Sequence, residues 1–262
     1  MFDTKQFYDD LASYYHLIFE DWDASMVRQG DALAQLISTE LSGETSADLR
    51  VHDAACGIGT QTLPLAASGF QLTARDLSPP AIARLQHEAE IRQLVVDAAV
   101  SDMREIASSV SGSFDVVIAF DNSLAHLLND SDLRAAFRQF VSVLRPGGVF
   151  LCSVRDYDKL KRGEPSTHQY GQREYRGETF LLRQDWSWDD SMHYHATLII
   201  DKETPIGFTQ VLSVVSRFYA VSIDQLLVLM REVGFQDARR IEETIYQPIL
   251  AARKPGRKSR KP

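Results

Sequence analysis

Apolar residues recur at helical spacing near the start of the chain. One set consists of Phe7, Leu11, Tyr14 and Ile18, and a second set, after Trp22, consists of Leu33, Ala34, Leu36 and Ile37. This spacing places the apolar side chains of each set on one face of a helix, where they can pack against a core. We therefore expect two helices ahead of the first strand.

The middle of the chain alternates between short apolar runs and amphipathic segments. The runs predict strands at 50–53, 71–76, 93–96 and 114–120, and a fifth strand that ends near Arg155. Among the helical segments, the one that follows Ser78-Pro79-Pro80 has the clearest start, because serine caps a helix and proline fits its first turn. Strands that alternate with helices predict a mostly parallel sheet.

The pattern changes after Arg155. A polar stretch leads into three β-rich runs, which predict an antiparallel insertion at 179–186, 193–200 and 210–219. The α/β pattern resumes at Ser222-Ile-Asp-Gln225, which resembles a capping box, and two last strands at 235–241 and 246–252 are expected to form a hairpin.

The whole pattern predicts an α/β fold, Rossmann-like and doubly wound, with a mostly parallel seven-stranded sheet and an antiparallel β insertion. We expect residues 1–155 and 221–252 to form the main domain, 156–220 the insertion, and 253–262 a basic disordered tail.

Composition narrows the class of protein. The 262 residues are 44% hydrophobic, which suffices for one large core, and the two cysteines make a weak case for a disulfide. No leader-like start and no apolar run of membrane-spanning length is present, so we expect a soluble, cytoplasmic protein. The net charge of −8 becomes −14 without the six basic residues of the tail, which disfavours binding to nucleic acid. A small-molecule partner is expected, and the oligomeric state stays open.

A glycine-rich turn follows the first predicted strand, in Asp53-Ala-Ala-Cys-Gly57-Ile-Gly59. Glycines there let the backbone approach a ligand, but a nicotinamide cofactor needs the same feature. An acid at Asp53 suits a cofactor with a cationic amino acid portion and would repel a pyrophosphate, and the third glycine of the dinucleotide fingerprint is missing. These features favour S-adenosylmethionine (SAM).

Two further strand ends complete the predicted cofactor site. Asp76 ends the second strand, where its carboxylate can accept hydrogen bonds from both ribose hydroxyls. Asp102 and Met103 follow the next strand and offer an acceptor for the exocyclic amine and an apolar face for adenine. We also place Ala55, Leu77 and Phe120 in this site.

These motifs give the chain a resemblance to the class I SAM-dependent methyltransferases, from Asp53-Ala-Ala-Cys-Gly-Ile-Gly59 through Leu144-Arg-Pro-Gly-Gly148. Within that superfamily it is most similar to the glycine and sarcosine N-methyltransferase group. The segments that carry the closer match are Ala54-Ala-Cys-Gly57, Asp121-Asn-Ser-Leu-Ala-His126 and Val154-Arg-Asp-Tyr-Asp158. Two departures stand out: Asp121 replaces the usual glycine, and Asp156 replaces an asparagine.

The resemblance implies roles for residues outside the glycine-rich turn. Arg28 matches an arginine that pairs with the SAM carboxylate, and Tyr8 and Tyr15 would close over the cofactor. For Tyr15, packing on the core is an equally good reading.

The acceptor site is expected at the ends of the fourth and fifth strands. Asn122 and Arg155 would hold a small carboxylate beside the methyl group, although Arg155 could instead pair with Asp156 or Asp158. His126 could orient the cofactor, act as a base or simply pack on its neighbours. Tyr194, on the insertion that covers this site, could wall the pocket.

The chemistry needs no metal, and we expect none. His193 and His195 form a His-x-His pair without further ligands at convincing spacing. The sharpest functional prediction is methyl transfer to the amine of glycine, sarcosine or a related amino acid. The alternatives are an O-methyltransferase of a small metabolite, a nicotinamide-dependent oxidoreductase and a SAM-binding regulator without catalysis.

Overall fold

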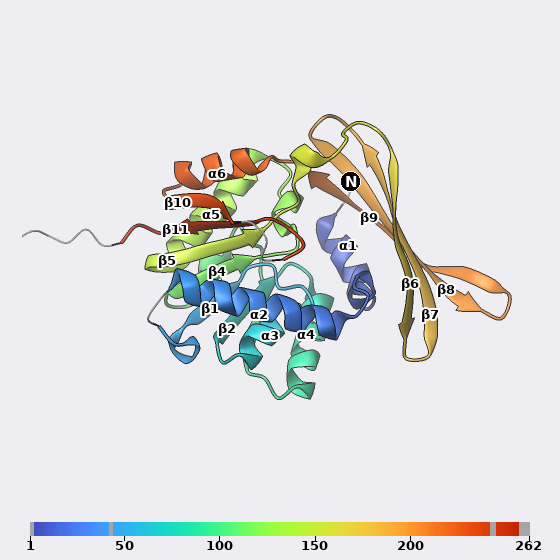
Figure 1. Cartoon of the computed structure of the whole chain (residues 1–262), viewed down its shortest axis with the longest axis horizontal. Helices are drawn as coiled ribbons and strands as arrows, with labels where there is room; N and C mark the ends of the chain where they lie inside the picture. Colours follow the sequence, from blue (N-terminus) through green and yellow to red (C-terminus); the bar gives the residue numbers. More distant parts are fainter. Residues whose placement is uncertain (1–2, 42–43, 242–244, 257–262) are drawn as a thin grey trace, which may run out of the picture.

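The computed structural model describes residues 3–41, 44–241 and 245–256. Its α/β body contains a seven-stranded sheet in the order β10-β11-β5-β4-β1-β2-β3 (Figure 1). The strands are β1 Arg50–Asp53, β2 Gln71–Asp76, β3 Val96–Val100, β4 Phe114–Ala119, β5 Leu144–Ser153, β10 Gln236–Ile241 and β11 Ile249–Arg253. Strands β1 to β5 pair in parallel, whereas β11 runs antiparallel to both β5 and β10. The predicted fold class is confirmed.

Helices cover both faces of this sheet. They are α2 Trp22–Glu40, α3 Thr62–Ala67, α4 Pro79–Ile91, α5 Asp130–Val143 and α6 Ile223–Glu232, whereas α1 Thr4–Leu11 lies outside these layers. The central strands alternate between the two layers: Val116 and Ile118 of β4 pack with α2, while Val117 and Ala119 pack with α5 and α6. Because both faces are buried, these strands read as continuous apolar runs. No helix among the described residues is long and apolar enough to cross a membrane.

A second, antiparallel sheet stands beside the body, in the order β6-β7-β8-β9 (Figure 1). Its strands are β6 Ser166–Tyr175, β7 Glu178–Trp188, β8 His193–Thr204 and β9 Gly207–Tyr219. Helix α1 lies between the two sheets, where Phe7 and Leu11 pack with Leu198 and Val214 of the second sheet. The short 3-10 helix η1 (Tyr15–Ile18) continues this contact. Helix α1 is therefore the layer through which the antiparallel sheet meets the body.

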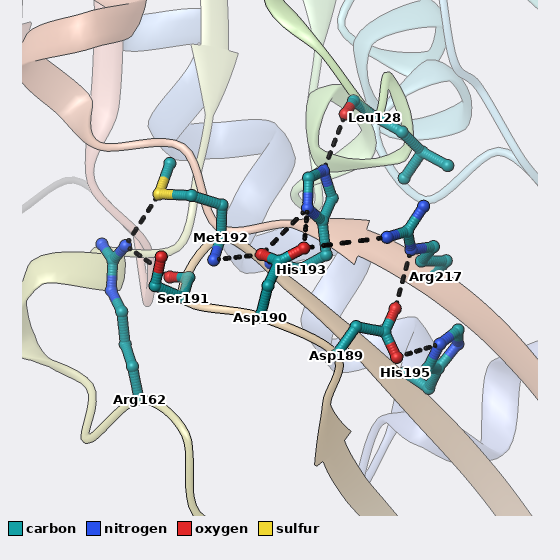
Figure 2. Close-up of polar contacts among 9 residues, drawn as sticks. All are labelled: Leu128, Arg162, Asp189, Asp190, Ser191, Met192, His193, His195 and Arg217. Atoms are coloured by element: carbon teal, nitrogen blue, oxygen red, sulfur yellow. Dashed lines mark hydrogen bonds and ion pairs between the residues drawn. The ribbon is translucent and has the colours of Figure 1, made fainter.

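Polar contacts at the start of β8 also tie the antiparallel sheet to the body (Figure 2). The two ring nitrogens of His193 lie 2.9 Å from the Leu128 carbonyl oxygen of the body and 2.9 Å from the Asp190 carboxylate. Asp189 pairs with His195 at 2.7 Å and with Arg217 at 2.9 Å. Both histidines of the His-x-His pair thus serve as structural contacts, and no group of three or more metal-ligating side chains is found among the described residues.

Three local predictions differ from the structure. The predicted strand at 93–96 is shifted, because β3 covers Val96–Val100 and Gln93 has a left-handed backbone with φ 55°. Strand β6 was not predicted, since most of its side chains are exposed and lack an apolar alternation. The capping box is incomplete: Ser222 caps α6, but the Gln225 side chain donates to Asp130 and not back to Ser222.

Candidate active site

The carboxyl ends of β1, β2 and β4 open into a cavity of about 470 Å³, which we call the crevice. Its position follows from the parallel sheet, because the strand ends and the turns after them meet at one edge. Of the residues predicted to bind the cofactor, nine line it: Tyr8, Tyr15, Ala55, Gly57, Asp76, Leu77, Asp102, Met103 and Phe120. The strand-end reasoning therefore leads to one continuous cavity.

Gly57 and Asp76 fix the shape of the crevice floor. Gly57 has a left-handed backbone with φ 51°, and a Cβ there would meet no atom within 4 Å, so the backbone and not crowding requires glycine. The Gly57 N–H donates to Asp76 Oδ2 at 2.8 Å, and the Ser78 N–H donates to Asp76 Oδ1 at 2.9 Å. Burial raises the pKa of Asp76, although these two bonds act in the opposite direction. The carboxylate is held in one orientation at the end of β2.

The donors and charges of the crevice fit SAM better than a dinucleotide. Four carboxylates line its wall, those of Asp3, Asp76, Asp102 and Asp121, and Arg104 on the same wall pairs with Asp102 at 2.6 Å. The excess of negative charge attracts a sulfonium cation and repels a pyrophosphate. The Ser123 hydroxyl is buried on the same wall without a hydrogen-bond partner among the described residues. Such a group is satisfied when a polar ligand occupies the cavity.

Two predicted cofactor residues lie elsewhere. Asp53 does not line the crevice but lies 1% exposed beneath it, where it accepts from the Thr62 hydroxyl at 2.7 Å and from the Ala55 N–H at 3.2 Å. Burial raises the pKa of Asp53 to about 7. Arg28 is exposed on the wall of a second cavity, and its guanidinium donates to the Ser25 hydroxyl at 2.9 Å. Its predicted pairing with the SAM carboxylate stays a prediction.

Tyr8 contacts the rings of both Tyr15 and His126; the two tyrosines line both cavities, and His126 lines the crevice. The Tyr8 hydroxyl lies 2.8 Å from His126 Nε2, and the Ser216 hydroxyl lies 3.2 Å from His126 Nδ1. Burial lowers the pKa of His126 to about 3, so the imidazole is neutral near pH 7 and is too weak a base to hold a proton there. The arrangement suits an orienting role for His126 through the Tyr8 hydroxyl.

The second cavity, which we call the chamber, has a volume of about 580 Å³ and lies between the body and the antiparallel sheet. It shares Tyr8, Tyr15 and Asp121 with the crevice. The predicted acceptor residues Asn122 and Arg155 are on its wall. Much of the remaining wall is apolar and comes from Phe7, Leu11, Ile18, Phe19, Leu198 and Phe218.

Four residues next to the chamber form a closed hydrogen-bonded ring. Asn122 Nδ2 donates to the Tyr157 hydroxyl at 2.8 Å, which lies 3.1 Å from the Tyr194 hydroxyl. Arg155 Nη1 donates to Tyr194 at 2.8 Å, and the Arg155 backbone N–H closes the ring on Asn122 Oδ1 at 2.9 Å. Tyr194 is fully buried, so it supports Arg155 from behind and does not line the chamber.

The ring leaves the Arg155 guanidinium at the chamber wall, 4.5 Å above the ring of Trp186. It forms no ion pair with Asp156 or Asp158. Asp156 pairs instead with Arg240 at 3.0 Å and Lys159 at 3.4 Å, and Asp158 pairs with Arg162 at 3.0 Å. The extra charge at Asp156 is therefore offset outside the chamber.

Asp121 stands where the two cavities meet. The Tyr246 hydroxyl donates to its Oδ1, and Gln61 Nε2 donates to its Oδ2 at 3.1 Å. Asp121 and Asn122 both adopt left-handed backbones, with φ 55° and 63°. Two successive non-glycine residues of this kind are costly and are typical of functional sites.

The sequence reasoning missed several wall residues. Gln61 lies two residues after Gly59 of the glycine-rich turn, and Ser123 follows Asn122, so neighbours of the motifs could have been included. Tyr157 lies within the segment that carries the family resemblance. No sequence signal connects Tyr246 with Asp121, because the contact depends on the loop between β10 and β11.

Comparisons with known proteins agree with this geometry. Residues 51–148 match the model of a family described as a methyltransferase domain. The chain is 29% identical over 188 residues to the glycine/sarcosine N-methyltransferase of Parasynechococcus marenigrum (strain WH8102), which covers 68% of this chain and 64% of the relative. It is 31% identical over 151 residues to the enzyme of the same name from Halorhodospira halochloris, covering 57% of this chain and 54% of the relative. The matched segments thus span less than two thirds of these relatives.

Solved structures are similar to the chain over most of its length. Streptomyces venezuelae DesVI superposes with a TM-score of 0.75 at 17% identity, covering 95% of this chain and 98% of that one. SAM-bound CalS10, an amino pentose methyltransferase from Micromonospora echinaspora, superposes with a TM-score of 0.72 at 18% identity, covering 88% and 92%. At this identity the likeness concerns the fold.

Proposed function

We propose that the chain, which is similar to the class I SAM-dependent methyltransferases, transfers the methyl group of SAM to the amine of a small, carboxylate-bearing molecule. Glycine, sarcosine and related amino acids are the first acceptors to consider, because relatives of the chain carry those names.

The observation that carries this proposal is the placement of Arg155. Its guanidinium lies on the wall of the chamber, has no carboxylate partner among the described residues, and is held from behind by Tyr194. An arginine that is fixed in this way is suited to bidentate binding of a carboxylate. A carboxylate bound there would hold the rest of the acceptor in the chamber, next to the wall shared with the crevice.

The chain's own residues supply positioning and exclude water. SAM carries the electrophilic methyl group on its sulfonium, so the protein needs no covalent nucleophile. Tyr8 and Tyr15 border both cavities and bring the two ligands together. Alignment of this kind contributes roughly 7 kcal/mol or more to lowering a barrier. Asn122, whose amide is engaged at both ends, acts as a positioning residue for Arg155.

Matched acceptors test the proposal. Purified protein is incubated with SAM and either glycine, sarcosine or L-phenylalanine, or with their hydroxyl counterparts glycolate and L-phenyllactate, and S-adenosylhomocysteine is measured. L-phenylalanine is included because the apolar chamber wall has room for a larger side chain. We expect product with at least one amine and none with its hydroxyl counterpart, and mass spectrometry should place the methyl group on nitrogen.

The opposite pattern would contradict the proposal. Turnover of the hydroxy acids alone would assign the chain to O-methylation. Binding of NADH and no binding of SAM in calorimetry would show that the chain is not a SAM-dependent methyltransferase.

A further inference from the structure

Asp121 is a carboxylate without a cationic partner in a largely enclosed position. Its two hydrogen bonds come from the neutral side chains of Tyr246 and Gln61, and it forms no ion pair with any residue that the structure describes. An ionised carboxylate in such surroundings is unfavourable unless a positive charge compensates it. The site therefore favours a bound cation.

The groups that face Asp121 from neighbouring elements strengthen this preference. They are the phenols of Tyr8 on α1, Tyr15 on η1 and Tyr246 before β11, and the carboxyl group of Asp53 at the end of β1, and each of them has its pKa raised in part by Asp121. None of them carries a positive charge. Burial in turn raises the pKa of Asp121. A carboxylate of this kind holds a proton more readily than an exposed one.

The chamber places a positive and a negative side chain on one cavity. Arg28 and Arg155 are the arginines on the chamber wall, and Glu20 and Asp121 are the carboxylates; of these four, Asp121 also lines the crevice. An amino acid has the complementary charges. With its carboxylate on Arg155, its ammonium group is directed to the wall that borders the crevice, which is where the methyl group must be met.

The backbone supports a functional reason for aspartate at this position. Asp121 has φ 55°, a conformation that glycine adopts without cost and that other residues adopt at some expense. The strained aspartate is therefore not needed to form the turn, and its carboxylate is the feature to explain.

We propose that Asp121 binds the ammonium group of the acceptor and receives the proton that this group must lose before methyl transfer. The proposal rests on the proposed function and adds the cation site to it. The proton passes from the acceptor nitrogen to a carboxylate oxygen of Asp121. The nitrogen lone pair then forms the N–C bond as the C–S bond breaks, and the electron pair of the C–S bond goes to sulfur. The product leaves as a methylated ammonium ion, and the proton on Asp121 is released to solvent.

The test uses the full chain with Asp121→Asn and Asp121→Gly, and with Asp156→Asn as the matched control outside the chamber. The glycine variant relieves the left-handed backbone and is therefore expected to fold. Two quantities are measured: the Kd of SAM by calorimetry, and the pH dependence of kcat/KM with whichever of glycine, sarcosine and L-phenylalanine is turned over fastest by the wild type.

In the wild type we expect kcat/KM to be independent of pH between the pKa of Asp121 and that of the amine. Over this range Asp121 is ionised and the acceptor amine is protonated, which is the combination that the proposed proton transfer requires. In both Asp121 variants only the free amine is productive, so kcat/KM should rise ~10-fold per pH unit up to the amine pKa. The variants should also raise KM ~10- to 100-fold near neutral pH, as expected for a lost charge-assisted bond. The control should keep the wild-type profile and the wild-type Kd of SAM. Because Asp121 also lines the crevice, its variants should weaken SAM binding, but by a smaller factor than they raise the KM of the acceptor.

Two results would overturn the inference while leaving the proposed function intact. One is a flat profile in Asp121→Asn. The other is a large loss of SAM affinity with an unchanged acceptor profile, which would assign Asp121 to the ammonium group of SAM. If the wild type turns over none of the three amines, the proposed function fails, and this inference fails with it.

Discussion

Replacement of Tyr157 by phenylalanine removes one hydroxyl from the ring that holds Arg155. Tyr157 is 1% exposed, and its hydroxyl accepts from Asn122 Nδ2 at 2.8 Å and meets the Tyr194 hydroxyl at 3.1 Å. In Tyr157→Phe the buried Asn122 N–H loses its acceptor, and no water replaces it if the phenyl ring keeps its position. The side chain is otherwise unchanged in shape.

The size of the effect follows from this geometry. A buried polar group that is left without a partner costs ~1–3 kcal/mol, and the lost contact to Tyr194 adds ~0.5–1.5 kcal/mol. We therefore expect Tyr157→Phe to lower the free energy of unfolding by about 1.5–4.5 kcal/mol. Tyr14→Phe is the matched control, because the partly buried Tyr14 hydroxyl makes no hydrogen bond to a described residue. That variant should stay within ~0.5 kcal/mol of the wild type.

Urea unfolding followed by tryptophan fluorescence measures both variants, and an unchanged m-value shows that the difference concerns native stability. The double variant Tyr157→Phe/Tyr194→Phe should lose less than the sum of the single changes, because both remove the same contact. A loss below ~0.5 kcal/mol in Tyr157→Phe would show that the ring does not exist as described.

Three other predictions concern the ligands and pH. Asp76→Asn should weaken SAM binding by ~1–3 kcal/mol through the lost charge-assisted ribose bonds, and an unchanged Kd in calorimetry would count against the crevice. Arg155→Lys should raise KM for a carboxylate acceptor ~10-fold or more without changing the Kd of SAM, because lysine cannot bind bidentately, and equal losses for both ligands would place Arg155 at the cofactor. Burial raises the pKa of Asp53 to about 7, so the folded state binds the proton more tightly than the unfolded chain, and stability falls as the pH rises from about 4 to 7. Asp53→Asn should lack this component, up to ~1.4 kcal/mol per pH unit in urea unfolding, and parallel pH profiles for the two proteins would contradict it.

The sequence predicts the centre of the sheet well, because its strands are buried on both faces. Val116 to Ala119 read as an unbroken apolar run for that reason, and β4 lies where that run predicts it. Edge strands are less buried and therefore need no unbroken run of apolar residues. Val95 is 92% exposed although it belongs to an apolar run, and the neighbouring edge strand β3 contains polar and small residues.

The residues of the candidate site likewise include some that the sequence predicts and some that it does not. The positions of Gly57 and Asp76 on the crevice wall were predictable, because they follow from the turn and the strand end on which the two residues lie. The partners of Arg155 were not, since Tyr157 and Tyr194 come from different elements and meet only when the antiparallel sheet stands against the body. Asp53 shows a further limit: its position after the strand was correct, yet Thr62 engages its carboxylate beneath the crevice.

The wall shared by the crevice and the chamber has a thermodynamic consequence. Tyr8 and Tyr15 contact both cavities, so any shift of these side chains that accompanies one ligand changes the surface offered to the other. By linkage, the factor by which cofactor binding changes acceptor affinity equals the factor by which the acceptor changes cofactor affinity. Substitutions of either tyrosine should therefore alter two dissociation constants together, and their effects are interpretable only in a full four-state binding cycle.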